Sequence, residues 1–255
     1  MIGLHPTTVK NNRGGLRVPK AADVLADQIR RQIIAGELAE GERLPPEAEL
    51  MAQWQLGRPA VREALRILES EALVKVQRGN VGGAIVQAPS VSVTARSAAA
   101  ILQSQQIPLS DIYQARLAFE TGAAYLAAKV ADDASIAMLH GLLDDETGCV
   151  DDARLWSRAA SRFHQGVVAA SGVRTLKLFS DMTAEIIDDH QVQINIDPSR
   201  EDVGKRRAAS RSHAKLVRLI EARDAKRAQE HWQTHLEELN IRYFGDSVPF
   251  ATDPA

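Results

Sequence analysis

Apolar residues in the first 90 positions recur at two different spacings, and the change between them marks where helices give way to strands. Residues 21–35 have apolar side chains three and four positions apart and stop before Gly36, a residue typical of helix ends. Two shorter helical patterns then meet at a corner near Gly57, and runs rich in β-branched residues follow. The pattern predicts helices over 21–35 and 47–54, a helix that begins after Gly57, and strands over 73–77 and 84–87.

After residue 90 the spacing of apolar residues predicts helices only. No β signal of comparable strength occurs there, so we expect an all-α bundle of about six helices. A helix-turn-helix followed by a hairpin is a winged helix, and the predicted fold class is therefore mainly α, with a winged helix-turn-helix domain ahead of the bundle. The expected bundle helices cover residues 109–130, 133–147, 151–171, 173–194, 199–222 and 224–243.

Three arginines, Arg58, Arg62 and Arg66, lie four residues apart on the helix after the corner, on a different side from its apolar residues. A guanidinium can donate two hydrogen bonds to the O6 and N7 atoms of guanine. The stripe therefore fits a recognition helix in the major groove of DNA. The alternative is a solvated helix face on which the arginines pair with Glu63 and Glu69.

The two predicted strands are joined by a glycine-rich tip, Arg78-Gly79-Asn80-Val81-Gly82-Gly83, which carries one arginine. A cationic tip of this kind can enter the minor groove next to the recognition helix. The hairpin thus favours DNA binding over the alternative of a solvated face.

The stretch from Ala35 to Val86 resembles the N-terminal domain of the GntR family of bacterial transcription regulators, in its FadR branch. The strings AGELAEGERLP, RPAVREALRILESEALV and RGNVGGAIV carry the resemblance, as the entry, the recognition helix and the wing. This chain has Ala48 where the family has a DNA-contacting Arg, and Gly57 where it has Ser or Thr, so the operator sequence cannot be copied from relatives. The resemblance implies DNA contacts for Arg58, Pro59, Ala60, Arg62, Arg78 and Gly79, and the arginine stripe adds Arg66.

Composition agrees with a regulator without establishing one. Residues 1–90 hold 12 Lys and Arg against 10 Asp and Glu, an excess too small to indicate DNA binding by itself. Cys149 is the only cysteine, which excludes an internal disulfide and suits a reducing cytoplasm. No apolar run approaches the roughly 18 residues of a membrane span, and the N-terminus lacks a signal-peptide pattern. We expect a cytoplasmic protein with no membrane partner.

Breaks in these patterns predict the domain boundaries. The first residues have no periodic apolar pattern, so their scattered cations either contact DNA phosphates or belong to a plain disordered tail. A Ser/Ala-rich segment follows Pro89, and we expect it to end in a short helix before Pro108. The expected order is a flexible arm over 1–18, the DNA-binding domain over 19–88, a linker over 89–107, the bundle over 108–245 and a tail over 246–255.

Three histidines, His164, His213 and His235, lie on three different predicted helices of the bundle. Neutral imidazoles from facing helices can gather around a metal ion, although distance in sequence does not show that they do. Separate hydrogen-bonded histidines are the alternative. His231 precedes His235 by four residues and shares its helix face, which makes it a fallback ligand.

The strings DIYQARLAFETGAAYLAA, FHQGVVAASG and HAKLVRLIEARDAKRAQEHWQTHL resemble the FCD effector-binding domain that follows the winged helix in this branch. The resemblance places metal ligands at residue 160, His164, His213 and His235, but Ala160 stands where the family has an Asp. Three imidazoles can still hold Zn²⁺ or Ni²⁺, which prefer nitrogen donors more than Mg²⁺ does. The alternative is a site that has lost its metal and binds its effector through hydrogen bonds.

Arg116 matches an Arg of the family's opening helix that can face the effector pocket, where a guanidinium would pair with an organic acid. The alternative for Arg116 is an ion pair with Glu120, four residues later. Asn195, on the fourth bundle helix, is a further candidate for the lining. We therefore expect a small carboxylate effector, rather than an acyl-CoA, at a site made of Arg116, His164, His213, His235 and Asn195.

Together these features predict a ligand-responsive transcription regulator, a repressor, that binds a palindromic operator as a homodimer, because one winged helix reads too few base pairs. One alternative is a metal-dependent hydrolase that uses the three histidines. No acidic residue stands at a motif-defined position beside them to act as a general base, so we do not expect an enzyme. The other alternative is a DNA-binding regulator without an effector.

Overall fold

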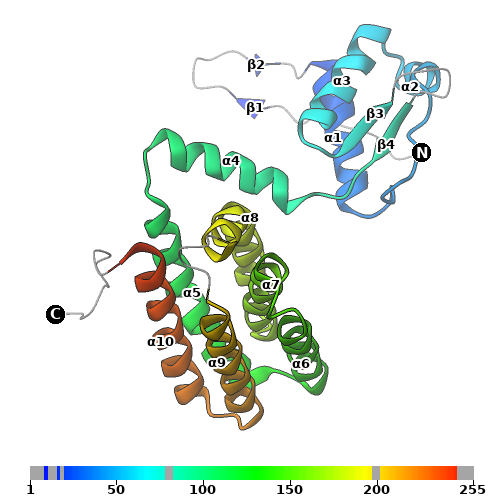
Figure 1. Ribbon diagram of the computed structural model, residues 1–255. Coiled ribbons are helices and arrows are strands. Elements are labelled where there is room, and N and C mark those ends of the chain that lie inside the picture. The colour runs from blue at the N-terminus through cyan, green and yellow to red at the C-terminus, as the bar shows by residue number, and fades with distance from the viewer. Residues whose placement is uncertain (1–8, 11–15, 18–19, 78–82, 197–201, 246–255) are drawn as a thin grey trace. The chain divides into compact units, whose positions relative to one another are not determined.

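The protein was analysed as a computed structural model, and its helices and strands are labelled in Figure 1. Within the described residues the chain divides into two compact units, Met1–Val93 and Thr94–Ala255. The first holds a winged helix-turn-helix and the second a bundle of helices, which confirms the mainly α fold class. The described residues are 9–10, 16–17, 20–77, 83–196 and 202–245.

The helices of the first unit are α1 (Ala21–Ile34), α2 (Glu47–Trp54) and α3 (Arg58–Ser70). Helix α1 ends before Gly36, whose φ of 74° is in the left-handed region that glycine adopts without strain. The corner between α2 and α3 is made by Gln55, which is left-handed with φ 52°, and by extended Gly57 at the N-cap of α3.

One apolar core lies beneath these helices. The inward face of α3 contributes Val61, Leu65 and Leu68, which pack with residues of α1 such as Leu25 and Ile29. Because the apolar positions of α3 are all turned into this core, its remaining side chains face outward. An ion pair from Arg30 of α1 to Glu71 also ties α1 to the end of α3, with N–O distances of 2.7 and 2.6 Å.

The wing consists of β3 (Val74–Gln77) and β4 (Gly83–Val86), which pair antiparallel with Val74 opposite Val86 and Gln77 opposite Gly83. A third segment, residues 41–44, lies along the other edge of β4. Leu44 N donates to Ala84 O at 2.9 Å, and Val86 N donates to Glu42 O at 2.8 Å. Sequence patterns did not predict this segment, because four residues that begin at Gly41 and end before Pro45 are too few to show alternation.

The N-terminal arm was predicted to lack structure, but it contains β1 (Val9–Lys10) and β2 (Leu16–Arg17), which pair antiparallel. Two-residue strands are shorter than the windows in which alternation can be detected. The sequence pattern therefore missed the pairing of these four residues.

The second unit contains α4 (Val91–Ser104), α5 (Leu109–Val130), α6 (Asp133–Gly148), α7 (Ala153–Ala170), α8 (Arg174–Ile196), α9 (Val203–Glu221) and α10 (Ala225–Phe244). Most of the predicted linker is thus helical as α4, and the division between the units falls within it. Four of these helices begin at an aspartate whose carboxylate accepts a backbone N–H of the first turn. The capping residues are Asp132, Asp152, Asp202 and Asp224.

Helix α7 lies at the centre of the bundle and packs against α5, α6, α8 and α9. Small residues such as Ala159, Gly166 and Ala170 let its neighbours approach closely. The core around it includes Phe163, and Trp232 of α10 packs in the same cluster. Buried side chains of α7 therefore lie next to residues of α5, α6, α8 and α9. None of the described helices is both long and apolar enough to cross a membrane.

Candidate functional site

The arginine stripe lies on the outer face of α3. Arg58, Arg62 and Arg66 are all exposed, and the Arg62 and Arg66 side chains keep 57% and 76% of their surface in contact with solvent. Pro59 is exposed and Ala60 is half-buried at the first turn of the same helix. The face that the sequence assigned to DNA is thus free to meet a duplex, and its three guanidiniums are not used in the core.

The stripe makes only part of the ion pairs that the alternative of a solvated helix face requires. Arg66 lies 3.7 Å from Glu63, but Glu69 accepts a hydrogen bond from the backbone N–H of Val76 at 3.0 Å and so supports the wing. Arg62 instead contacts Glu47 of α2, at 3.1 and 3.2 Å. Arg78 and Gly79, which the sequence also assigned to DNA, lie outside the described residues.

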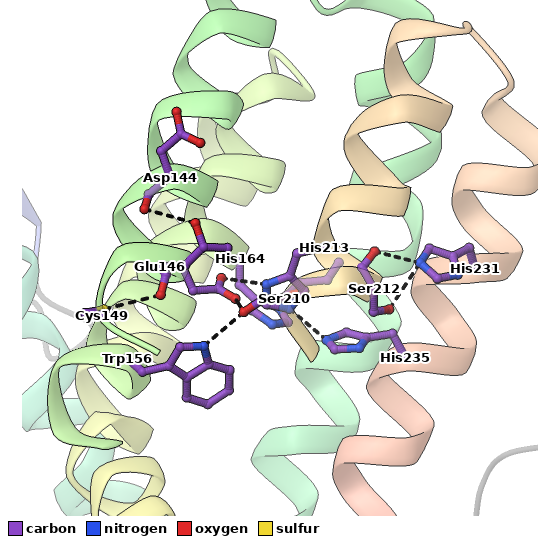
Figure 2. Close-up of polar contacts among 12 residues, drawn as sticks. Asp144, Glu146, Cys149, Trp156, His164, Ser210, Ser212, His213, His231 and His235 are labelled. Atoms are coloured by element: carbon purple, nitrogen blue, oxygen red, sulfur yellow. Dashed lines mark hydrogen bonds and ion pairs between the residues drawn. The ribbon is translucent and has the colours of Figure 1, made fainter. Parts of the chain in front are cut away.

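A second site lies inside the bundle, where the three histidines come together (Figure 2). His164 comes from α7, His213 from α9 and His235 from α10, and all three are buried. One ring nitrogen of each lies within 4.8 Å of the others. Nε2 of His213 and Nε2 of His235 are 3.1 Å apart.

Buried carboxylates orient two of these histidines. Nδ1 of His164 donates to Glu120 at 2.7 Å, and Nδ1 of His213 donates to Glu146 at 2.7 Å. Because an ionised carboxylate only accepts hydrogen bonds, each of these two imidazoles carries a proton on Nδ1 and turns Nε2 toward the other histidines, where Nε2 of His213 meets Nε2 of His235. This is the arrangement in which a neutral imidazole binds a metal.

The surroundings of the site favour neutral forms of His164 and His235 beside an ionised Glu120. Burial alone would raise the pKa of Glu120, but the Arg116 guanidinium and His164 outweigh it and hold that pKa at about 2. Burial, together with Arg116, lowers the pKa of His164 to about 4. Burial and the neighbouring rings of His213 and His164 lower the pKa of His235 well below its usual value.

Further contacts fix the rings in place. Ser210 donates its hydroxyl to Glu146 and accepts a hydrogen bond from Trp156 Nε1 at 3.1 Å. Phe163 stacks on His213 with ring centroids 4.5 Å apart, and Trp232 stacks on His235 at 4.8 Å. The histidines are therefore held from behind by a network that spans five helices.

The three histidines line a cavity of about 20 Å³. A water molecule needs roughly 10–15 Å³, so the cavity suits an ion with about one water but no larger molecule in this conformation. Ala160 also lines it, one helical turn before His164, and offers no donor. The lining also carries hydroxyl and amide groups, from Ser157, Ser161, Gln191 and Asn195.

Arg116 does not line this cavity. It is buried and donates from Nε to Glu120 at 2.6 Å, the ion pair that the sequence offered as the alternative. Its Nη1 atom has no hydrogen-bond partner among the described residues, and the side chain borders a second cavity of about 10 Å³. Ser161 and His164 line both cavities, so Arg116 lies behind His164 as seen from the other histidines.

His231 lies apart from the other three histidines. Its Nε2 contacts the backbone oxygen of Ser212 at 2.9 Å, and the side chain is half-buried between α9 and α10 (Figure 2). It is absent from the lining of the histidine cavity. The structure thus offers His164, His213 and His235 as the donor set, without the fallback ligand.

Sequence reasoning missed Glu120 and Glu146 as members of the site. Glu120 is the only acidic residue in the apolar stretch from Leu117 to Leu126, and a lone charge there is a signal of a buried partner. Glu146 stands in the acidic run Asp144-Asp145-Glu146, which resembles a solvated surface. Only the packing of α6 against α9 reveals that this one carboxylate is buried.

The donor set fits a metal ion that prefers nitrogen. Zn–N bonds of about 2.0–2.1 Å place ligand nitrogens about 3.3 Å apart in a tetrahedron. The three nitrogens lie within 4.8 Å of one another, so small side-chain rotations bring them to that spacing. With Ala160 in place of a carboxylate, the chain would supply three ligands to such an ion and would leave at least one coordination position open.

An exposed arginine stripe on a winged helix, joined in one chain to a helical domain with a buried polar site, defines a DNA-binding regulator of transcription. Residues 21–82 match the family of bacterial regulatory proteins of the gntR type, and residues 111–238 match the FCD domain. The chain therefore belongs to the GntR family, in the group that carries an FCD domain, and this family consists of regulators and not of enzymes.

Known relatives cover nearly the whole chain. It is 28% identical over 243 residues to the HTH-type transcriptional repressor NanR of Salmonella arizonae, covering 93% of this chain and 90% of the relative. The NanR of Salmonella newport is 29% identical over 227 residues, covering 88% and 85%. A solved GntR structure from Streptococcus agalactiae has the same fold, with a TM-score of 0.67 and 20% identity over 87% of this chain and 98% of that one.

Proposed function

We propose that this regulator is a repressor that binds a palindromic operator as a homodimer and responds to a small organic acid at a metal ion held by His164, His213 and His235. Its relatives are named transcriptional repressors, which supports repression. The observation that carries the effector part is the convergence of three buried histidines in one cavity, two of them oriented by buried glutamates.

The DNA part of the proposal rests on α3 as the recognition helix. Its exposed arginines Arg58, Arg62 and Arg66 would contact base edges and phosphates, with Pro59 and Ala60 near the bases. One such helix reads only a few base pairs, and two copies related by two-fold symmetry would supply the specificity that a genome demands. The regulator would do this in the cytoplasm, where the bacterial chromosome lies.

The metal part names Zn²⁺ or Ni²⁺ held by three imidazole nitrogens. A divalent ion in the cavity would be flanked by the negative charges of Glu120 and Glu146, each one hydrogen bond away through a histidine. The bound ion supplies an electrophilic position for an anionic ligand. Residue 160 adds no carboxylate, so an acidic effector would bring the missing negative donor.

The volume of the histidine cavity and the charges around it limit the effectors that the site can take. A cavity of about 20 Å³ holds no acyl chain, so binding of an organic acid must open the wall formed by α7 and α8, where Ser161 and Asn195 lie. Arg116 is paired with Glu120, but its Nη1 atom has no hydrogen-bond partner among the described residues, so this N–H group could donate to an acid that enters beside His164. A ligand that binds the opened bundle more tightly than the closed one shifts the population of the protein toward the opened state. The affinity for operator DNA would change with that shift.

Elemental analysis of protein purified without chelator tests the metal part. Wild type should contain about one Zn or Ni per chain, and His213→Ala should lose it, because two imidazoles bind such ions weakly. His231→Ala is the matched control, since it removes a histidine from the next turn of α10 that does not line the cavity. Metal in neither wild type nor control would remove the coordination proposal and leave DNA binding untouched.

A thermal-shift screen of the metal-loaded protein tests the effector part. Small carboxylates and sugar acids should raise the melting temperature, since a ligand that binds the folded state alone stabilises it. The same compounds should change the affinity for operator DNA. If none of them acts, the alternative of a regulator without a small-molecule effector gains support.

A further inference from the structure

Arg62 differs from its neighbours on the α3 stripe because a residue of another helix holds its guanidinium. Its Nε lies 3.1 and 3.2 Å from the two carboxylate oxygens of Glu47, the first residue of α2. Among the described residues, Arg58 has no such partner and Arg66 reaches only Glu63 of its own helix. The contact fixes one arginine of the stripe relative to the scaffold of the helix-turn-helix.

The contact uses only the inner edge of the guanidinium. Nε points back to α2, and no hydrogen bond from Nη1 or Nη2 of Arg62 to the described residues competes for them. The outer edge of the fork therefore presents two N–H groups side by side. That edge is what donates to O6 and N7 of a single guanine.

We propose that Glu47 is a positioning residue that holds Arg62 for end-on recognition of guanine. The proposal rests on the assignment of α3 as the recognition helix. A long side chain that is 57% exposed would otherwise sample many rotamers before binding, and its ordering would weaken the contact with the base. The contact with Glu47 holds Arg62 in one rotamer already in the free protein, so less side-chain entropy is lost when the base is bound.

The same carboxylate has a cost for binding to DNA of any sequence. A negative charge at the rim of the recognition helix repels phosphates and offsets part of the charge of Arg62. Glu47 therefore improves discrimination between sequences while lowering affinity for DNA as such. Replacing a residue needed only for folding would lower both affinity and discrimination. Replacing a residue that acts only as a repulsive charge would raise affinity for every sequence and leave discrimination unchanged.

Selection from a random-sequence duplex library with the full-length protein tests this proposal. Wild type should enrich a motif with a guanine in each half-site that Arg62→Ala no longer selects. Glu47→Gln should reduce the preference for that same guanine about tenfold, the scale of one bidentate contact. It should also bind unselected random duplex more tightly than wild type.

Glu49→Gln is the matched control, because Glu49 carries the same charge in the first turn of α2, is exposed, and contacts no α3 arginine among the described residues. It should bind random duplex more tightly and keep the guanine preference. Glu47→Asp keeps the charge but shortens the reach, so it should lose the preference with no gain on random duplex.

Two results distinguish the ways in which this can fail. If Arg62→Ala keeps the whole wild-type motif, the assignment of α3 arginines to base reading is wrong, and the role of Glu47 falls with it. If Arg62→Ala loses one guanine but Glu47→Gln and Glu47→Asp both keep it, Arg62 reads that base without help and only the positioning proposal is overturned.

Discussion

Replacing Glu120 with glutamine should weaken the bundle strongly, although it changes one atom of the side chain. The Glu120 carboxylate accepts hydrogen bonds from Arg116 Nε at 2.6 Å, His164 Nδ1 at 2.7 Å and Trp232 Nε1 at 3.2 Å. The side chains of Arg116 and Glu120 are only 5% and 2% exposed. Glutamine would turn an NH₂ group toward these donors and leave the Arg116 charge buried without its counter-charge.

The expected loss in the free energy of unfolding is about 3–5 kcal/mol, the usual cost of breaking a buried ion pair from one side. Domains of this size are held by about 5–15 kcal/mol, so the change is large enough to measure without ambiguity. Urea denaturation followed by tryptophan fluorescence is the suitable assay, because Trp232 lies in the affected network. The slope of the transition should stay the same, since the folded state buries the same surface.

The double variant Arg116→Met with Glu120→Gln provides the control. It removes the unpaired charge along with its partner, so it should be more stable than Glu120→Gln alone. A loss below about 1 kcal/mol in the single variant, the size of an ordinary hydrogen bond, would show that water reaches Arg116 and that the pair is not truly buried. A double variant less stable than the single one would contradict the same reasoning.

Three further substitutions test the histidine cavity and the contact between α6 and α7. Ala160→Asp places a carboxylate in the histidine cavity and should tighten Zn²⁺ binding by at least the roughly tenfold that an outer-sphere partner contributes, as measured by competition with a chelating dye; unchanged affinity would mean that residue 160 cannot reach the ion. Gly166→Ala would drive its Cβ into Leu142 Cδ1, so the Leu142 side chain must move, and the variant should lose about 1 kcal/mol in urea denaturation, the lower end of the usual cost of overpacking. Gly141→Ala, where a Cβ meets nothing within 4 Å, should instead stabilise α6 by up to about 1 kcal/mol, and equal effects at both glycines would argue against the tight α6–α7 contact.

Local patterns were sufficient where a structure is built from neighbouring residues. The bounds of α2 and α5 match the predicted ranges, because apolar spacing and flanking prolines act within one helix. The starts of α7 and α9 were predicted two and four residues too early, and their true positions follow the capping carboxylates of Asp152 and Asp202. Those caps are visible in the sequence, but aspartate is also common in loops.

Contacts between distant residues were beyond such patterns. Nothing local distinguishes Glu146 from its acidic neighbours, and the pairing of Arg62 with Glu47 joins two helices through a corner. Arg116 is a residue for which local spacing predicts one contact and misses another. Its ion pair with Glu120 was foreseeable from a spacing of four residues, whereas its place behind His164 depends on how α5 packs on α7.

By itself the sequence determined that a guanidinium-bearing helix follows a helix-turn-helix corner and that three histidines occupy three separate helices, because helix periodicity and turn residues act over a few positions. Only the tertiary structure decided that these histidines share one cavity and that buried glutamates accept hydrogen bonds from two of them, His164 and His213. The physical reason is that burial, and the low dielectric that makes a carboxylate beside an imidazole strong, exist only after helices far apart in the chain have packed together.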